Sequence, residues 1–405
     1  MNPSASSQPF IAIACGGTGG HLFPGLAVAE ELKLRGCAVA LLISPKDVDQ
    51  QAVKSVSGME ILKLPAVGLQ NRNYFSFARS FWNSWRTARK FFKTRRPQAV
   101  LAMGGFTSAP PVLAGRRCGA KTFLHESNTV PGRANRFLAR FVDAAFVGFP
   151  EAASKLNPAK TTVTGTPVRP QFQPRDAAPC RVALCLDPAK PVVLVVGGSQ
   201  GASGLNAMII SALPLLAKKN WQWLHLTGAA DFDAVRAAYA GHGIKAVVKP
   251  FLLEMDLALG AATACVSRSG ASSLAEIAAM RLPSLLVPFP AAADNHQLSN
   301  AQAFCSVGAA QLIEQKNARP EEVAALVTEL MEDAAVREKM QGALAQWHAP
   351  QSAADIASAI YKLAVAPQTG AAGKGATPAA SGHVHVPGVA ALLIFAGLNF
   401  VSLFH

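Results

Sequence analysis

The amino-acid sequence predicts an α/β protein built from two Rossmann-like parallel-sheet domains that face each other across a cleft. Short apolar runs alternate with amphipathic segments of helical length through most of the chain, which is typical of βαβ units. A glycine-rich turn follows the first predicted strand of each half, at Gly16–His21 and at Gly197–Ala202. Between the halves, a polar stretch crowded with prolines, from Pro167 to Pro179, predicts a linker between domains.

Each half is expected to form one domain, over residues 1–170 and 171–348. The apolar runs of the first half predict strands at Phe10–Cys15, Ala38–Ile43, Ala99–Met103 and Lys121–His125, with a helix over Leu22–Leu34. Those of the second half predict strands at Val192–Val196, Trp221–Leu226, Thr263–Ser267 and Ser284–Val287. We expect residues 349–366 to form a helix that returns to the N-terminal domain.

The last residues are predicted to form a linker and a hydrophobic tail. Residues 367–388 are rich in Gly, Ala, Thr, Pro and Ser, which is typical of a flexible linker. Residues 389–405 form the tail, and its segment Val389–Phe404 carries no charged side chain. This segment is shorter than the roughly 20 residues of a usual spanning helix. A membrane anchor and a simple extension that packs on the body or stays disordered both remain open.

The composition narrows the class of protein. Half of the 405 residues are hydrophobic, so a large core is available and a disordered or fibrous chain is excluded. The formal net charge of +14 indicates an anionic partner, which is a phosphate-bearing ligand, a nucleic acid or an acidic membrane surface. The seven cysteines are scattered without a C-x-x-C pair, and the N-terminus lacks the features of a secretory signal. We therefore expect reduced thiols in a protein that stays in the cytosol.

The first glycine-rich turn, Gly16–His21, is a candidate cradle for a phosphate or a sugar. Glycines bring backbone N–H groups close to a ligand, and the helix N-terminus behind them favours negative charge. The dinucleotide fingerprint fails because Leu22 stands at its third glycine position, and no P-loop is present. His21 is either a capping or packing histidine or a general base or oxyanion partner near neutral pH, and the glycines around it favour the second pair of roles.

Polar residues also follow two other strands of the first half. Gly104-Gly105-Phe106 and His125-Glu126-Ser127-Asn128 come directly after predicted strands. Because the carboxyl ends of parallel strands meet at one edge of the sheet, we expect these residues to gather around the first glycine loop.

Two segments of the second half are suited to a nucleotide sugar. Arg268–Ser273 precede a helix that carries Glu276. Small residues at a helix N-terminus can bind a diphosphate, and a carboxylate one turn later can accept hydrogen bonds from ribose hydroxyls. An ordinary serine cap, with Glu276 favouring the helix dipole, is the alternative. Asp294–Gln297 offer amides and a histidine for sugar hydroxyls. No cluster has metal-ligand spacing, so the sequence requires neither a metal nor a cofactor.

A strongly basic stretch lies between these motifs. Residues 61–125 contain twelve Lys or Arg and no Asp or Glu, and aromatic residues from Phe75 to Phe92 are interleaved with the charges. This composition is typical of a helix that lies on anionic lipid. A helix with a buried aromatic face and solvated charges is the alternative. Nucleic acid is disfavoured, because no nucleic-acid-binding motif accompanies the charge.

The ordered motifs resemble those of the MurG family of bacterial peptidoglycan glycosyltransferases over about residues 10–363. They are Gly16–His21 with Pro24–Ala27, Gly104–Phe106, His125–Asn128, Gly165–Arg169, Gly197–Ala202, Arg268–Glu276 and Asp294–Gln297. The resemblance implies the GT-B architecture, two Rossmann-like domains separated by a cleft. It also implies metal-independent, inverting transfer of N-acetylglucosamine from UDP-GlcNAc to the 4-hydroxyl of undecaprenyl-diphosphate-MurNAc-pentapeptide.

The resemblance assigns roles to individual residues. Ser199, Gln200, Ala271, Ser272 and Ser273 would bind the donor diphosphate, with Arg169 assisting and Arg268 as a further substrate contact. Glu276 would hold the ribose, Phe251 and Leu252 would flank the uracil, and Asn128, His296 and Gln297 would address the sugar. Thr18, Gly19, Gly20, Gly105 and Phe106 would form the acceptor side. His21 would be the general base, with Glu126 as an alternative base or an orienting partner.

The same resemblance implies the partners and the location. They are UDP-GlcNAc, the undecaprenyl-linked muramyl-pentapeptide, an anionic membrane surface and other cell-wall synthesis proteins, without nucleic acid. The expected location is peripheral, on the cytoplasmic face of the bacterial inner membrane. Phe106 and His296 depart from the Tyr and Gln of many relatives. The alternatives are another GT-B glycosyltransferase, a UDP-GlcNAc 2-epimerase, which has no need of the basic aromatic stretch, and a membrane-binding module without activity.

Overall fold

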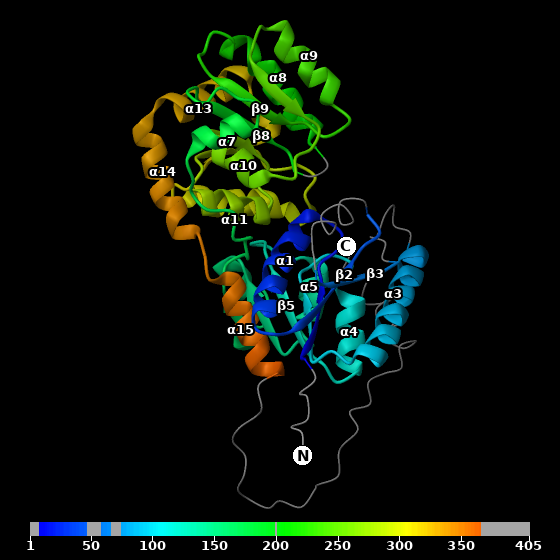
Figure 1. Ribbon diagram of the computed structural model, residues 1–405. Helices are drawn as coiled ribbons and strands as arrows, with labels where there is room; N and C mark the ends of the chain where they lie inside the picture. The colour runs from blue at the N-terminus through cyan, green and yellow to red at the C-terminus, as the bar shows by residue number, and fades with distance from the viewer. Residues whose placement is uncertain (1–7, 47–57, 66–73, 199–200, 366–405) are drawn as a thin grey trace, which may run out of the picture.

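The computed structural model describes residues 8–46, 58–65, 74–198 and 201–365, and it has two parallel-sheet domains stacked one above the other (Figure 1). In the described part of the N-terminal domain a seven-stranded sheet has the order β3-β2-β1-β4-β5-β6-β7. Its strands are β1 (Phe10–Ala14), β2 (Ala38–Ile43), β3 (Glu60–Lys63), β4 (Ala99–Ala102), β5 (Lys121–Glu126), β6 (Ala144–Val147) and β7 (Thr161–Val163). Its helices are α1 (Gly19–Leu34), α3 (Tyr74–Arg95), α4 (Ala109–Arg117), α5 (Arg133–Leu138), α6 (Pro150–Ala153) and the 3₁₀ turn η1 (Pro158–Lys160).

The C-terminal domain repeats this plan. Its described strands form a six-stranded parallel sheet of order β10-β9-β8-β11-β12-β13. They are β8 (Val192–Val196), β9 (Gln222–Leu226), β10 (Ala246–Lys249), β11 (Ala264–Ser267), β12 (Ser284–Leu286) and β13 (Gln311–Leu312). The helical elements of this domain are α7 (Ala177–Ala183), α8 (Ser203–Leu216), α9 (Phe232–Gly241), α10 (Met255–Ala261), α11 (Ala271–Met280), η2 (Ala293–Asn295), α12 (His296–Ser306), η3 (Gln315–Asn317), α13 (Pro320–Glu332) and α14 (Ala334–Trp347). The last described helix of the chain is α15 (Ser352–Ala364).

The predicted fold class is confirmed, with small shifts at the ends of elements. The continuous apolar runs form the central strands, and β2 and β8 have the predicted bounds. The first helix, however, begins at Gly19 and not at Leu22. Gly19, Gly20 and His21 therefore lie in the first helical turn, and the His21 N–H donates to the Thr18 carbonyl at 3.1 Å.

The last described helix belongs spatially to the first domain. Figure 1 shows α15 beside the N-terminal sheet, whereas α14 lies against the C-terminal domain. Ile356, Ala357 and Ile360 of α15 are buried in one cluster with residues of α1 and β1. Burying an isoleucine side chain contributes about 2–3 kcal/mol, so α15 is firmly attached there. The chain thus crosses between the domains twice, once near Arg169 and once between α14 and α15.

Helix α3 carries the basic aromatic stretch, and it turns most of the aromatic side chains inward. Trp85 is 8% exposed and Phe92 is fully buried against the N-terminal sheet. Phe81, Trp82 and Phe91 are partly buried in the same cluster. The expectation of a helix that offers its aromatic face to lipid is therefore wrong for most of α3. The burial of this face leaves the charges outside.

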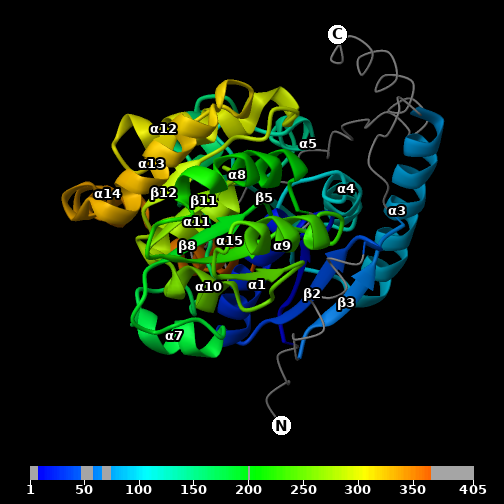
Figure 2. The same ribbon diagram turned by 90° about the horizontal axis from the view of Figure 1, so that it is seen from above.

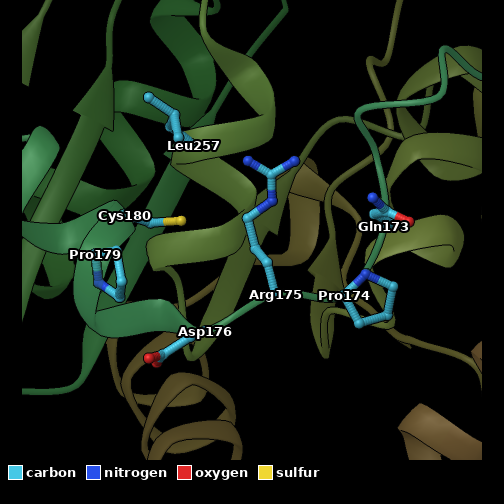
Figure 3. A pocket seen from close by; sticks show the side chains of 7 residues that line it. All are labelled: Gln173, Pro174, Arg175, Asp176, Pro179, Cys180 and Leu257. Atoms are coloured by element: carbon cyan, nitrogen blue, oxygen red, sulfur yellow. The ribbon is translucent and has the colours of Figure 1, made fainter.

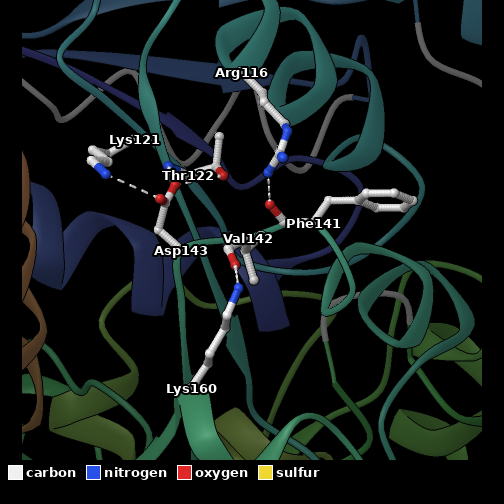
Figure 4. Close-up of polar contacts among 7 residues, drawn as sticks. All are labelled: Arg116, Lys121, Thr122, Phe141, Val142, Asp143 and Lys160. Carbon is white, nitrogen blue, oxygen red and sulfur yellow. Dashed lines mark hydrogen bonds and ion pairs between the residues drawn. The ribbon is translucent and has the colours of Figure 1, made fainter. Parts of the chain in front are cut away.

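The sheet edge opposite the strand carboxyl ends holds a compact polar cluster (Figure 4). The Asp143 carboxylate accepts hydrogen bonds from Thr122 N at 2.8 Å and from Lys121 Nζ at 3.3 Å. Burial raises the pKa of Asp143, but these bonds outweigh it, and the pKa lies below its ordinary value. Arg116 donates to the Phe141 carbonyl and Lys160 to the Val142 carbonyl at 3.2 Å. Several cations of this edge thus stabilise the fold.

Candidate functional site

Two helix N-termini meet between the domains. Helix α1 begins after β1 in one domain, and α11 begins after β11 in the other. A β-carbon added at Gly20 would lie 3.5 Å from Ser272 Oγ, so the two helix ends are close together. Helix N-termini bind anions through their free N–H groups and their dipoles. The residues that the sequence assigned to acceptor and donor, Thr18 to Gly20 and Ala271 to Ser273, therefore surround one region suited to phosphate groups.

The His21 imidazole lies against the backbone of Gly104 and Gly105. A β-carbon at Gly104 would lie 2.8 Å from His21 Cε1, and one at Gly105 would lie 3.0 Å from His21 Cδ2. Both glycines have positive φ angles, 105° and 76°, which other residues rarely adopt. The second glycine turn thus provides the space in which the histidine of the first turn sits. This is the convergence that the strand order predicts.

Phe106 lies over the first glycine turn. A β-carbon at Gly17 would lie 3.2 Å from Phe106 Cε1. Lys46 Nζ donates to the Gly17 carbonyl at 3.1 Å and lies 5.6 Å from the centre of the Phe106 ring. The sequence reasoning missed Lys46, although it follows the carboxyl end of β2 and so belongs to the same sheet edge. It adds a positive charge beside the acceptor-side residues.

Glu126 is buried and its carboxylate is saturated with hydrogen bonds. Oε1 accepts from Asn128 N at 2.9 Å and from Asn128 Nδ2 at 3.0 Å. Oε2 accepts from Gly132 N and from Asn135 Nδ2, both at 2.9 Å. A carboxylate with four donors holds its surroundings in place and has little capacity left to accept a substrate proton. The geometry favours the orienting role of Glu126 over the role of base.

His125 is fully buried behind Glu126. Its Nε2 lies 3.0 Å from the Gly165 carbonyl, and Ser127 Oγ lies 3.3 Å from its Nδ1. Burial lowers the pKa of His125 to about 4, because the imidazolium would lose its hydration. His125 is therefore neutral near pH 7 and links β5 to the segment that leads to the second domain. Ser352 of α15 donates to the same Gly165 carbonyl at 2.9 Å.

Arg169 and Glu276 carry charge into the space between the domains. The Arg169 guanidinium lies 4.3 Å from the Phe23 ring centre and 5.1 Å from that of Phe172. Burial raises the pKa of Glu276 to about 7, the positive charge of Arg169 opposes this shift, and Asp256 adds to it. The carboxyl group is thus set to titrate near neutral pH, which is common at functional sites.

Arg268 is buried and its side chain links several segments of the C-terminal domain by hydrogen bonds. Its Nη1 donates to the carbonyls of Val287 at 3.0 Å and Pro288 at 3.1 Å, and its Nη2 donates to Gln315 Oε1 at 2.7 Å. Burial lowers the pKa of this guanidinium. Both terminal nitrogens therefore have protein partners. This arrangement favours a structural role over the substrate contact that the sequence reasoning assigned to Arg268.

The remaining predicted donor residues lie at the ends of C-terminal strands or begin α12. His296 Nδ1 lies 2.7 Å from the Ala293 carbonyl, and Gln297 Oε1 accepts from Phe289 N at 3.0 Å. Phe251 is 39% exposed, whereas Leu252 is buried. Ser199 and Gln200 lie outside the described residues.

One cavity lies apart from these residues, at the linker between the domains (Figure 3). It has a volume of about 370 Å³ and is lined by Gln173, Pro174, Arg175, Asp176, Pro179, Cys180 and Leu257. Arg175 Nη1 is paired with Asp256 at 3.0 Å. Within the described ranges, no three His, Cys, Asp or Glu side chains are grouped to hold a metal ion. No helix among the described residues is long and apolar enough to span a bilayer.

Comparisons with known proteins agree with this geometry. The model of the glycosyltransferase family 28 N-terminal domain matches residues 11–147, and that of its C-terminal domain matches residues 192–360. A UDP-N-acetylglucosamine–N-acetylmuramyl-(pentapeptide) pyrophosphoryl-undecaprenol N-acetylglucosamine transferase of Anaeromyxobacter dehalogenans strain 2CP-C is 36% identical over 362 residues, 87% of this chain and 92% of the relative. The transferase of the same name from Prochlorococcus marinus strain MIT 9303 is 39% identical over 326 residues, 80% of this chain and 88% of the relative.

Solved structures give the same result. The crystal structure of Acinetobacter baumannii MurG has a TM-score of 0.67 and 27% identity, and covers 88% of this chain and 99% of that one. A putative UDP-N-acetylglucosamine 2-epimerase from Listeria monocytogenes has a TM-score of 0.66 but only 14% identity, over 88% of this chain and 96% of that one. The epimerase likeness shows the shared GT-B fold alone. The opposed N-termini of α1 and α11 and the relatives that match over both domains lead to one conclusion: the chain belongs to the MurG family of N-acetylglucosamine transferases, within glycosyltransferase family 28.

Proposed function

We propose that this chain transfers N-acetylglucosamine from UDP-GlcNAc to the 4-hydroxyl of undecaprenyl-diphosphate-MurNAc-pentapeptide. The observation that carries the proposal is the meeting of two helix N-termini, α1 and α11, between the domains. A reaction between two diphosphate-bearing substrates needs two adjacent anion sites, and each helix end supplies one. The relatives whose names state this activity match both domains.

His21 is the proposed general base on the acceptor side. It lies in the first turn of α1 and is enclosed by the backbone of Gly104 and Gly105. An inverting transfer requires one displacement at the anomeric carbon, and a base removes the proton of the attacking 4-hydroxyl. Glu126 would keep the loop Asn128–Asn135 in place without taking a proton. The other acceptor contacts in this proposal are Thr18, Gly19, Gly20, Gly105 and Phe106.

The departing UDP would be stabilised by the C-terminal domain. The α11 N-terminus at Ala271–Ser273 and the Arg169 guanidinium would neutralise the diphosphate. Glu276 would accept hydrogen bonds from the ribose, and Phe251 and Leu252 would flank the uracil. The sugar would be held by Asn128, His296 and Gln297, and Ser199 and Gln200 would add contacts to the diphosphate.

A lipid-linked acceptor places the proposed reaction at a membrane surface. The chain would work at the cytoplasmic face of the bacterial inner membrane, in contact with anionic lipid and with other cell-wall synthesis proteins. The described part of α3 supports this with a basic outer face and with Phe75, which is 81% exposed. Each Lys or Arg near a surface of anionic lipid contributes about 1 kcal/mol to the free energy of membrane binding.

A transfer assay tests the proposal. The purified full chain is incubated with UDP-GlcNAc and the undecaprenyl-linked muramyl-pentapeptide in EDTA, and UDP and the disaccharide product are measured. We expect turnover without divalent metal. A His21→Ala variant should lose about 10²–10⁴-fold in kcat and keep its affinity for UDP-GlcNAc. Formation of the C2 epimer of UDP-GlcNAc without disaccharide would support the epimerase instead, and near-normal kcat in the variant would remove His21 as the base.

A further inference from the structure

A buried asparagine of the C-terminal domain binds a loop of the N-terminal domain. Asn300, on α12, is fully buried, and its Oδ1 accepts from both the N–H and the hydroxyl of Thr129 at 3.0 Å. Its Nδ2 donates to Asn128 Oδ1 at 3.1 Å and to the Ser269 carbonyl at 3.1 Å. An amide side chain has two donor hydrogens and an oxygen with two lone pairs. All four hydrogen-bonding positions of the Asn300 amide have partners, and three of these hydrogen bonds cross the domain boundary.

A second contact crosses the boundary six residues earlier. Asp294 forms an ion pair with Arg136 at 2.8 Å and lies 3.8 Å from Arg133, both on α5. Asp294 and Asn295 have φ angles of 50° and 51°, a left-handed conformation that Asp and Asn adopt more readily than other residues with a side chain. Figure 2 shows α12 and α5 at the same edge of the molecule.

The N-terminal partners of these contacts form one connected unit. Asn128 is tied to Glu126, and Glu126 is tied to Asn135, the neighbour of Arg136. Asn300 and Asp294 therefore bind the two ends of one hydrogen-bonded loop, and we name the two contacts together the clasp. The C-terminal residues between the two contact points include His296 and Gln297, which the proposed function assigns to the sugar.

We propose that Asn300 is a positioning residue that acts through Asn128. With the Asp294–Arg136 pair, it closes the two domains so that Asn128 faces His296 and Gln297 over the donor sugar. The inference rests on the proposed function for the identity of the sugar, but the closure itself does not depend on turnover. Because the clasp joins protein groups only, its loss lowers the closed fraction of the free protein. The apparent affinity for the donor falls by that same fraction.

The test combines kinetics with a distance measurement that needs no activity. Asn300→Asp keeps the acceptors for Thr129 but cannot donate to Asn128 or to Ser269. We expect the KM for UDP-GlcNAc to rise about tenfold, since a buried hydrogen bond to a carbonyl is worth about 1.4 kcal/mol. We expect kcat to fall less than threefold, because saturating donor restores closure. Gln302→Ala, an exposed position on the same helix, is the matched control and should match the wild type.

Spin labels on two native thiols report the closure. Cys118 is exposed in the N-terminal domain and Cys185 in the C-terminal domain, and Cys305→Ser removes a partly exposed third thiol. Without donor, the distance distribution between the labels should broaden in Asn300→Asp and narrow again with saturating UDP-GlcNAc. Unchanged distances in the variant would overturn the proposal, and so would a loss of kcat at unchanged KM. Failure of the transferase assay alone would leave this distance result intact.

The ion pair gives an independent check. Arg136→Asp should raise the KM for the donor about threefold, and the charge swap Arg136→Asp with Asp294→Arg should restore at least half of that loss. A merely structural effect would make the double variant worse than either single variant. If the effects of the two single variants on the KM simply add in the double variant, the Asp294–Arg136 pair is not part of the clasp.

Discussion

At the scale of single residues, the glycine at position 104 determines where the proposed base sits. Its φ is 105°, and a β-carbon there would come within 2.8 Å of the His21 ring. We predict that Gly104→Ala displaces the imidazole and lowers kcat by about 10²-fold, since misplacing a catalytic group by about 1 Å has that effect. Gly119 is the matched control, because its φ is 85° but no heavy atom lies within 4 Å of the added carbon. Steady-state kinetics should show the loss in Gly104→Ala alone.

Glu276 makes donor binding depend on pH. Its pKa of about 7 results chiefly from burial, so the carboxylate is charged above pH 7 and protonated below it. The charged form is the stronger acceptor for the ribose hydroxyls, because protonation turns one carboxyl oxygen into a donor and removes the negative charge. We predict that the Kd for UDP, measured by calorimetry, rises about tenfold from pH 8 to pH 6. Glu276→Gln should bind weakly at both pH values, and parallel pH profiles for the two proteins would contradict the prediction.

The sequence could place residues at the site, but it could not assign their partners. Glu126 ends the buried strand β5 and Arg268 follows the buried strand β11, so their position at the cleft edge was predictable. The Glu126 side chain accepts four hydrogen bonds from the loop that directly follows it, and the Arg268 side chain donates three to segments further along the chain; both sets depend on how these loops fold. Asn300 carried no sequence signal, because nothing in its neighbours along the chain shows which groups its side chain contacts. Its role depends on how the two domains meet.

At the scale of elements, continuous apolar runs predicted the central strands but not those at the sheet edges. β3 and β7 are largely exposed edge strands, and β13 has only two residues, so none of them shows a continuous apolar run. β6 is buried but only four residues long. The sequence also predicted α3 as a basic helix rich in aromatic residues. That pattern is the same whether lipid or the sheet covers the aromatic face. Packing against the N-terminal sheet decided this.

The outward charges of α3 should therefore dominate its contact with lipid. We predict that Lys90→Glu with Lys93→Glu weakens binding to vesicles containing anionic lipid by more than tenfold, at about 1 kcal/mol for each cation lost. Co-sedimentation with the vesicles at physiological salt measures this. Lys218→Glu with Lys245→Glu makes the same charge change on exposed positions of the C-terminal domain and should have little effect. An equal loss in both variants would indicate a response to net charge alone.

At the scale of the whole molecule, the chain connects the two domains twice, through the linker after Arg169 and through the segment between α14 and α15. Phe149 of the N-terminal domain lies 5.3 Å, between ring centres, from Trp347 at the end of α14, and Trp347 stacks on Phe304 of α12 at 4.6 Å. Beyond this aromatic contact, α15 packs on the first domain. The clasp at α12 and the aromatic contact hold the same pair of domains at two places. Both contacts include α12, so movement of this helix affects both.

The hydrophobic tail, residues 389–405, lies outside the described residues but continues from α15, which is attached to the N-terminal domain. The basic face of α3 belongs to that same domain. An apolar, uncharged segment on a linker of 22 residues, 367–388, would add a second, independent attachment to lipid. Two weak attachments joined by a linker reinforce each other through a high effective concentration.

We therefore predict that deleting Val389–His405 lowers recovery of the protein with membranes, while transfer to a soluble acceptor analogue stays within about twofold. The control keeps the tail and replaces Leu392 and Phe395 with Ser, which tests apolarity separately from length. Combining the deletion with Lys90→Glu and Lys93→Glu should lower the affinity for membranes by no more than the product of the separate losses, because either change alone already removes the gain that comes from joining two attachments. Equal recovery of the truncated and full-length chains would show that the basic face of α3 suffices without the tail.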